Sequence, residues 1–261
     1  MTILEKILSQ KQVEVEFAKT KYSLNDLRQQ ALYARQCIPL ADALRSKDIG
    51  IIAEIKRASP SKGVIRENFQ PAVIARAYAE NGAAAISVLT DVQFFQGNLG
   101  NLCDIRSVVL LPLLRKDFII EEYQIHEAKA NGADAVLLIA AALEKNLLSD
   151  LHRAAAGIGM DVLVEVHEEQ ELEKLDFDIV RLVGINNRNL KTFDVDVSTS
   201  LRLKKYFSVD TLIVSESGIE SADQMRRLST GGIRSFLIGE TFMRAEDPGA
   251  ALRILLEEVR S

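Results

Sequence analysis

Eight short apolar segments rich in β-branched residues alternate along this chain with longer, charged stretches of helical periodicity. Such alternation is typical of repeated βα units around a parallel sheet, whose strands are buried on both faces. We therefore predict an α/β fold in which the eight strands close into a (β/α)8 TIM barrel. The predicted strands cover residues 50–56, 85–90, 111–116, 135–140, 161–166, 182–186, 211–216 and 235–239.

An internal echo supports this repetition. The sequence NGAAAI at residues 81–86 recurs as NGADAV at 131–136 and, more faintly, as GGIRSF at 231–236. A helix that ends in a left-handed glycine can pass through a short turn directly into the next strand of a βα repeat. Two halves of an open, doubly wound sheet would echo similarly, but no GxGxxG follows the first predicted strand. The repeated sequence, together with the lack of this motif, therefore favours the closed barrel over the open sheet.

Length and composition indicate one globular domain over residues 1–261, with 48% hydrophobic and 26% charged residues. A net charge of −5 without a basic block argues against nucleic acid as a partner. The apolar runs are too short for a membrane span and the N-terminus does not resemble a signal peptide, so we expect a cytoplasmic protein. Cys37 and Cys103 lack metal-ligand spacing and are expected to be free thiols.

Residues 1–48 precede the first predicted strand and show helical periodicity, so we predict an N-terminal helical extension that packs on the barrel. A barrel does not need this segment. It could cover the bottom of the barrel as a plug, or the top as a lid that helps enclose a substrate. The pattern is compatible with both.

Polar residues end several of the predicted strands, where barrel enzymes carry their active sites. The alternation in Glu54-Ile55-Lys56 puts Glu54 and Lys56 on one face, which points into the barrel mouth if Ile55 faces the helices. A single charged residue at a strand end is commonly just solvated or ion-paired. Together, however, the cations predict a pocket for an anion, and the neighbouring carboxylates suit acid and base catalysis. The cations are Lys56, Arg57, Lys62, Lys116 and Arg188, and the carboxylates are Glu54, Glu165 and Glu216.

The last two predicted strands are followed by glycines, at Ser217-Gly218 and Gly239-Glu240. The loops after strands seven and eight are the common phosphate site of this fold, and glycine lets backbone N–H groups approach phosphate closely. Each glycine could also serve a plain turn. The polar segment 58–63, with a basic tip, is either a mobile lid over an anion or merely a long connection.

The three histidines, His126, His152 and His167, share no metal-ligand spacing, so we predict no metal site, and we expect the first two on the surface of helices. No G-x-S-x-G elbow is present, which argues against a Ser-His-Asp hydrolase. Phe94, Phe95 and Phe118 could form an apolar wall for a flat ring or simply pack in the core.

Five motifs are specific enough to indicate a family. They are AEIKRASPSKG at residues 53–63, LRKDFI at 114–119, VEVH at 164–167, GINNRNL at 184–190 and SESGI at 215–219. Over almost its whole length the chain resembles the indole-3-glycerol phosphate synthase family. The resemblance implies a carboxy-lyase of tryptophan biosynthesis, which closes an anthranilate-substituted sugar phosphate into an indole with loss of carbon dioxide and water. It implies no cofactor.

The resemblance also implies a role for each matching residue. Lys116 would be the general acid at the ketone oxygen, and Glu165 the acid/base residue of the later dehydration. Lys56 would be a second cation near the substrate carboxylate, with Glu54 and Asn186 holding Lys56 and the sugar hydroxyls. Glu216 would line the pocket. The phosphate would lie at Ser217, Gly218, Gly239 and Glu240, with Arg188 and Ser59 nearby, and the ring between Phe95, Phe118 and Leu137.

Partial desolvation and the nearby cations Lys56 and Arg188 predict a pKa for Lys116 that is lowered toward neutrality. Three other functions remain as alternatives. A phosphoribosylanthranilate isomerase or another phosphate-binding barrel would need a Cys/Asp or two-Asp pair at the strand ends. A Schiff-base aldolase could use Lys116 or Lys56, which borohydride trapping would reveal. A non-catalytic sugar-phosphate sensor would have little use for paired lysines and glutamates.

Overall fold

The computed structural model describes residues 2–189 and 192–261 and contains a closed barrel of eight parallel strands. The order around the barrel is β1-β10-β9-β8-β7-β6-β5-β4, so each strand lies beside its neighbours in sequence. The strands are β1 (Gly50–Ile55), β4 (Ala85–Leu89), β5 (Leu113–Lys116), β6 (Ala135–Ile139), β7 (Asp161–Val166), β8 (Leu182–Asn186), β9 (Leu212–Glu216) and β10 (Ser235–Ile238). The predicted TIM barrel is therefore confirmed.

The predicted strand bounds agree with the structure for β7 and β8 and differ by one or two residues for the others. The largest difference is at β5, which begins after Pro112 rather than at residue 111. Proline carries no backbone N–H, so it cannot donate to the ladder. The polar loop after β1 contains a short antiparallel hairpin, β2 (Ala58–Ser59) and β3 (Gly63–Val64), which the sequence did not predict.

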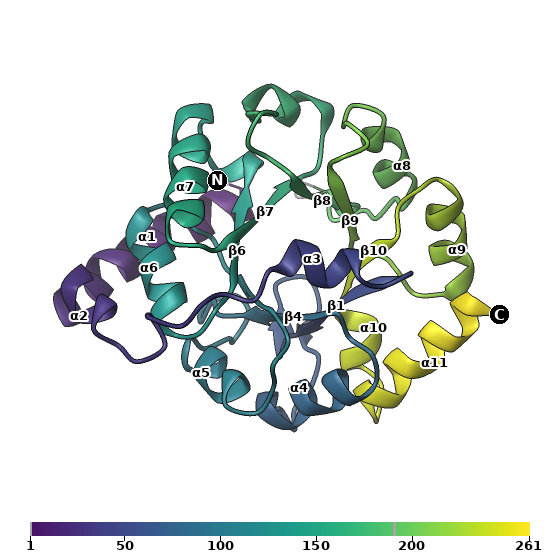
Figure 1. Cartoon of the computed structure of the whole chain (residues 1–261), viewed down its shortest axis with the longest axis horizontal. Coiled ribbons are helices and arrows are strands. Elements are labelled where there is room, and N and C mark those ends of the chain that lie inside the picture. The colour runs from purple at the N-terminus through teal and green to yellow at the C-terminus, as the bar shows by residue number, and fades with distance from the viewer. Residues whose placement is uncertain (1, 190–191) are drawn as a thin grey trace.

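Helices surround the barrel and connect its strands (Figure 1). They are α4 (Pro71–Glu80), α5 (Gly100–Arg106), α6 (Glu122–Ala130), α7 (Lys145–Gly157), α8 (Ser198–Lys204), α9 (Ala222–Thr230), α10 (Glu240–Met243) and α11 (Pro248–Arg260), with the 3-10 helices η1 (Ala140–Ala142) and η2 (Glu169–Lys174). None of the described helices is long and apolar enough to cross a membrane.

The glycines of the echoed motifs end helices as predicted. Gly82, Gly132 and Gly232 have positive φ values of 99°, 88° and 81°. In each case the next residue donates its backbone N–H to a carbonyl of the preceding helix, as Ala83 does to Tyr78 at 3.0 Å. This is the hydrogen bond that closes a helix with a left-handed glycine, and it turns the chain into the next strand.

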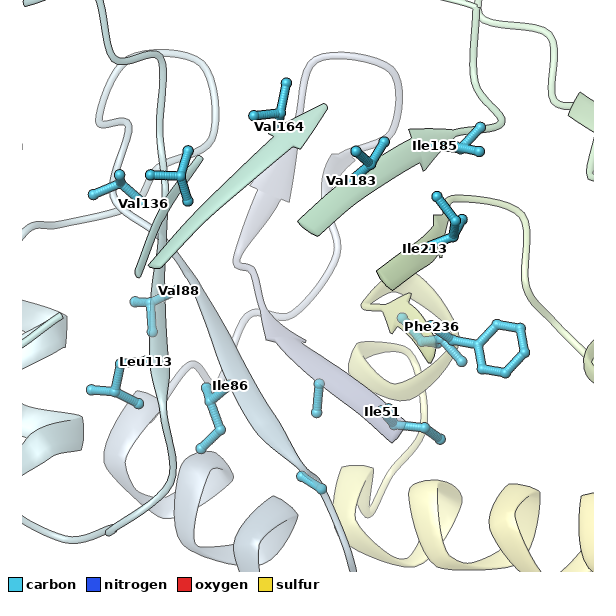
Figure 2. Packing of buried hydrophobic residues seen from close by; sticks show 14 of the residues in the cluster. Ile51, Ile86, Val88, Leu113, Val136, Val164, Val183, Ile185, Ile213 and Phe236 are labelled. Carbon is cyan, nitrogen blue, oxygen red and sulfur yellow. The ribbon is translucent and has the colours of Figure 1, made fainter. Parts of the chain in front are cut away.

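Alternation along the strands divides the core into two layers. One face of each strand packs against the helices, and Figure 2 shows side chains such as Ile51, Val136 and Phe236 on this outer face. Residues of the opposite parity, including Ile52 and Leu163, fill the inside of the barrel. The parity that puts Ile55 in the outer layer points its neighbours Glu54 and Lys56 into the barrel, as predicted.

The N-terminal extension forms α1 (Ile3–Lys21), α2 (Leu24–Arg28) and α3 (Leu40–Arg45). Figure 1 shows α3 lying across one end of the barrel, where Leu40 and Leu44 join the apolar layer inside it. Helix α1 contacts α6, and its Lys11 pairs with residues that follow β4 and β5. The extension therefore contacts both ends of the barrel.

Candidate active site

A cavity of about 630 Å³ opens at the carboxyl ends of the strands. Its size is typical of a site for a small ligand. All the residues to which the family resemblance assigned a role in the site line this cavity. They are Glu54, Lys56, Ser59, Phe95, Lys116, Phe118, Leu137, Glu165, Asn186, Arg188, Glu216, Ser217, Gly218, Gly239 and Glu240.

Lys116 lies at the centre of the site, between two carboxylates. Its Nζ is 2.7 Å from Glu165 Oε2 and 3.5 Å from Glu216 Oε2. Burial favours the neutral amine, but the charges of Glu165, Glu216 and Glu54 outweigh it and raise the pKa of Lys116 above its ordinary value. The predicted lowering of this pKa is therefore wrong: three carboxylates, rather than the cations considered, dominate the surroundings of Lys116.

The two carboxylates beside Lys116 have opposite pKa shifts. Burial opposes ionisation of Glu165, but Lys116 and His167 outweigh it and hold its pKa well below the ordinary value. At Glu216, burial and the neighbouring charge of Glu165 outweigh the attraction of Lys116 and raise the pKa to about 8. At neutral pH the site therefore holds a protonated lysine, an ionised Glu165 and a neutral Glu216.

Glu54 and Lys56 form a second pair at the end of β1, with Lys56 Nζ 2.6 Å from Glu54 Oε1. Gly239, at the end of β10, packs against this pair: a Cβ at Gly239 would overlap Glu54 Oε1 and lie 2.9 Å from Glu54 Cβ. Glycine is therefore needed here to leave room for the Glu54 side chain, in addition to the predicted approach to phosphate.

The turn after β9 has two consecutive residues with positive φ, Ser217 at 66° and Gly218 at 73°. Asn187 holds this turn, since its Nδ2 donates to the Ser217 carbonyl and to Ser215 Oγ, both at 3.0 Å. A left-handed conformation is uncommon for serine and persists where the surroundings fix it. The turn therefore presents its backbone to the cavity in a fixed geometry.

The mouth of the cavity combines charge and aromatic surface. The Nη2 atom of Arg188 lies 3.9 Å from Glu240 Oε2. The backbone N–H of Arg188 donates to Asn186 Oδ1 at 3.0 Å. The rings of Phe95 and Phe118 lie 6.1 Å apart at 37°, which gives an apolar wall near the charged centre. This arrangement suits a ligand that has a flat ring at one end and an anionic group at the other.

Comparison with known proteins identifies the family. The family model for indole-3-glycerol phosphate synthase matches residues 4–255. Over 258 residues the chain is 50% identical to the indole-3-glycerol phosphate synthase of Acidovorax sp. (strain JS42), and the match covers 96% of this chain and 97% of that protein. The chain belongs to the indole-3-glycerol phosphate synthase family.

Among solved structures, the chain resembles KGPDC from Streptococcus mutans, with a TM-score of 0.62, 14% identity, and coverage of 82% of this chain and 98% of that chain. It also resembles orotidine 5'-phosphate decarboxylase from Pyrococcus horikoshii OT3, with a TM-score of 0.58, 11% identity, and coverage of 81% and 99%. At these identities the likeness concerns the barrel fold alone.

As a member of the indole-3-glycerol phosphate synthase family, the protein is a carboxy-lyase of tryptophan biosynthesis. It converts 1-(2-carboxyphenylamino)-1-deoxy-D-ribulose 5-phosphate to indole-3-glycerol phosphate, carbon dioxide and water. The cavity agrees with this substrate, which carries an aromatic ring, a carboxylate and a phosphate.

Two sequence-based expectations differ from the structure: the place of Arg57 in the pocket and the exposure of the two helical histidines. Arg57 is not among the described residues that line the cavity, and neither is Phe94, for which core packing was the open alternative. Arg57 follows Lys56 directly, so alternation points it away from the mouth, and its side chain is exposed. His126 is buried rather than on the surface, because Tyr33 of the N-terminal extension stacks on it at 5.8 Å. His152 is partly buried in α7.

The expectation of free thiols agrees with the described part of the chain, in which Cys37 and Cys103 form no disulfide and are each partly buried. No group of three or more His, Cys, Asp or Glu residues in the described ranges could hold a metal ion. The motif at residues 184–190 ends at Leu190, which lies outside the described residues.

Sequence reasoning missed three residues that support the site. His167 contacts Glu165 at 3.2 Å, Asn187 holds the Ser217 turn, and Lys11 of α1 pairs with Asp91 and Asp117. His167 lies two residues after Glu165, and Asn187 lies directly after Asn186, each within one of the family motifs, and this proximity was the available signal. Lys11 had no such signal, because its partners lie far away in sequence.

Proposed function

We propose that Lys116 is the general acid of ring closure and that Glu165 is the acid/base residue of dehydration in the indole-3-glycerol phosphate synthase reaction. The observation that carries this assignment is the contact of 2.7 Å between Lys116 Nζ and Glu165 Oε2 inside the cavity. At neutral pH this contact joins a protonated Lys116, whose pKa is raised, to an ionised Glu165, whose pKa is lowered. A protonated lysine can donate a proton in ring closure, and an ionised glutamate can accept one in dehydration.

Ring closure needs a proton donor. The aromatic carbon that bears the carboxylate attacks the ketone carbon, and Lys116 Nζ transfers a proton to the developing alkoxide. The electron pair of the bond to the carboxylate then restores the aromatic ring as carbon dioxide leaves. Lys116 recovers its proton from solvent. The raised pKa keeps Lys116 protonated before each turnover.

Dehydration needs a base and an acid. The ionised Glu165 accepts a proton from the CH2 carbon of the new five-membered ring, and that C–H electron pair forms the carbon–carbon double bond as the bond to the hydroxyl breaks. Glu165 gives the proton to the departing hydroxyl, which leaves as water. Lys56, paired with Glu54 at 2.6 Å, is placed to neutralise the substrate carboxylate before it is lost. The side-chain oxygen of Asn186 accepts from the Arg188 backbone, and Asn186 also lines the cavity, where it would contact the sugar hydroxyls. The neutral Glu216 completes the polar wall.

The remaining residues bind the ends of the substrate. Backbone groups of the two glycine turns take the phosphate, with Arg188 and Ser59 nearby. The aromatic ring of the substrate lies against the wall formed by Phe95, Phe118 and Leu137. The turns involved are Ser217-Gly218 and Gly239-Glu240.

We also propose that residues 1–48 are part of one barrel domain over residues 1–261 and act at both of its ends. Ile3, Leu4 and Ile7 of α1 line the cavity, which supports a lid role for this helix. Helix α3 acts as the plug at the other end. The free thiols support a cytoplasmic location, and the net charge of −5 supports a small-molecule substrate rather than nucleic acid.

The two assigned steps can be separated by mutation. In Lys116→Met, kcat should fall by at least about 100-fold, while the folded protein still binds product, because the ammonium acts mainly in the transition state. In Glu165→Gln a decarboxylated, hydroxylated intermediate should accumulate. The assay follows indole absorbance after addition of the substrate in EDTA, and mass analysis of quenched samples detects the intermediate. Lys47→Met, at an exposed lysine before β1, is the matched control.

Loss of turnover in Lys116→Met without loss of product binding would support the assignment. Retention of more than about a tenth of wild-type kcat would contradict it, because general acid catalysis typically contributes at least about 100-fold. Borohydride trapping of a substrate adduct on Lys116 or Lys56 would instead indicate Schiff-base chemistry.

A further inference from the structure

His167 lies directly behind the active site. It follows the last residue of β7, two positions after Glu165, and only 6% of its surface is exposed. Its Nε2 is 3.2 Å from Glu165 Oε1, and its Nδ1 is 3.5 Å from Glu171 Oε2 in η2. The backbone N–H of His167 also donates to Glu171 Oε2 at 2.6 Å. The imidazole ring is therefore held between two carboxylates.

These contacts complete the surroundings of Glu165. One carboxylate oxygen, Oε2, pairs with Lys116, and the other, Oε1, pairs with His167. Both oxygens thus have a cationic partner, which fixes the plane of the carboxylate. His167 is not among the described residues that line the cavity, so it reaches the substrate through Glu165 alone.

The charges along this row alternate in sign: Glu171, His167, Glu165 and Lys116. Burial disfavours the imidazolium, but the close carboxylates of Glu165 and Glu171 outweigh it and raise the pKa of His167 to about 10. Beyond the row, Glu216 on β9 faces Lys116, while Lys174 of η2 donates to the carbonyls of Ala140 and Leu143. His167 is therefore positively charged at neutral pH.

We propose that His167 is a positioning residue for this reaction, which fixes Glu165 as an oriented carboxylate beside Lys116 while Glu171 fixes the imidazole ring. The inference rests on the role of Glu165 in dehydration proposed above. Without His167, Glu165 would keep one of its two cationic partners and could rotate about its side chain. A carboxylate that has lost an opposite charge is protonated at a higher pH, and a misplaced catalytic group works more slowly.

The test uses His167→Leu, which removes the imidazole that contacts both carboxylates, and His167→Gln, which keeps a polar side chain without the charge. We expect kcat to fall about ten-fold in His167→Leu and less in His167→Gln, with KM changed less than about two-fold. The acid limb of the kcat profile should move up by about one pH unit, because Glu165 is then protonated more easily.

Glu171→Gln tests the same row with His167 in place and should shift the acid limb in the same direction by a smaller amount. Its matched control is Glu173→Gln, an exposed residue of the same 3-10 helix, which should leave the profile unchanged. Folding of each variant is judged by circular dichroism and thermal unfolding. If His167→Leu does not fold, Glu171→Gln and His167→Gln still test the inference.

A double-mutant cycle separates positioning from a merely structural role. In a Glu165→Gln background, His167→Leu should cost little further turnover, because the group it positions is already absent. An equal loss in both backgrounds with an unmoved acid limb would overturn the inference. So would an unchanged kcat and acid limb in folded His167→Leu, Glu171→Gln and His167→Gln.

The failure of this inference is distinguishable from the failure of the proposed function. If Glu165→Gln turns over at the wild-type rate, the assigned role of Glu165 is wrong and the inference fails with it. If Glu165→Gln loses turnover while the His167 variants do not, the positioning role alone is wrong.

Discussion

Glu165 and Glu216 both contact Lys116, and their surroundings shift their pKa values in opposite directions. Glu165 has cations on both oxygens and stays ionised, whereas Glu216 shares a single cation and has its pKa raised to about 8. Gly184 on β8 makes room for Glu216, because a Cβ there would overlap Glu216 Oε1. Pairs of acidic groups whose pKa values are pushed apart in this way are typical of acid and base catalysis.

The close packing of Gly239 against Glu54 predicts that a methyl group added at position 239 disturbs the site. Gly239→Ala should displace the Glu54 side chain and break its pair with Lys56, because the new Cβ would clash with Glu54 Oε1 and lie only 2.9 Å from Glu54 Cβ. We expect kcat/KM to fall roughly ten-fold, through both kcat and KM, as catalytic geometry and substrate binding are both affected. Steady-state kinetics of the purified variant measure this.

The matched control is Gly157→Ala in α7, where a Cβ would meet nothing within 4 Å. It should leave the kinetics unchanged and stabilise the fold by up to about 1 kcal/mol. A Gly239→Ala variant with an altered KM and an unaltered kcat would show that Gly239 serves the phosphate site alone.

The places of the proposed catalytic residues in the cavity could be predicted from the sequence, but their ionisation could not. The rule that polar residues at strand ends point into the mouth placed Glu54, Lys116 and Glu165 in the cavity. The pKa of Lys116 depends on distances to Glu165 on β7 and Glu216 on β9, which closure of the barrel sets. The partner of His167 in η2 depends likewise on how a loop folds back.

Among the elements, α1 is held to the barrel by a buried ion cluster. Lys11 is 3% exposed, and its Nζ lies 3.0 Å from Asp91 Oδ2 and 2.8 Å from Asp117 Oδ1. The two aspartates follow β4 and β5, next to the strand end that carries Lys116. One turn earlier on the same helix, Ile7 lines the cavity. The cluster therefore fixes an apolar part of the cavity wall.

Removal of the Lys11 charge should loosen this helix. Lys11→Met leaves Asp91 and Asp117 buried without that partner, which typically costs about 3–5 kcal/mol when a buried pair is broken. We expect a lower free energy of unfolding and a KM raised several-fold, because the wall formed by α1 is less well held. Urea unfolding and steady-state kinetics measure the two effects.

Lys6→Met is the matched control, since Lys6 is an exposed residue of the same helix. Its effects on stability and KM should be small. If Lys11→Met destabilised the protein but left KM unchanged, α1 would contribute to the fold without shaping the substrate site.

Most elements of the molecule could be predicted from their patterns, because a strand buried on both faces leaves a continuous apolar run. The hairpin β2–β3 was missed, since its two-residue strands are too short for any periodicity. The extension was recognised as helical, but amphipathic periodicity does not say which neighbour a helix packs against. Contacts such as Lys11 with Asp91, or Tyr33 with His126, join segments far apart in sequence.

For the whole molecule, the raised pKa of Glu216 makes stability depend on pH. The folded protein keeps this proton up to about pH 8, whereas an unfolded glutamate releases it near its ordinary pKa of 4.5. The contribution of this group to the free energy of unfolding is therefore fully present below about pH 4.5 and is lost as the pH rises through 8. Above that pH, folding buries a charge that the unfolded chain exposes to water.

Glu216→Gln should remove this loss, because the amide keeps the shape of the protonated side chain and does not titrate. We expect the stability of the variant, relative to the wild type, to increase between pH 5 and pH 8 by an amount on the order of 2 kcal/mol. Urea unfolding at a series of pH values measures the difference in free energy of unfolding between the variant and the wild type. The matched control is Glu173→Gln, at an exposed site, for which this difference should not change with pH. A constant difference for Glu216→Gln as well would mean that Glu216 is already ionised in the folded barrel at pH 5.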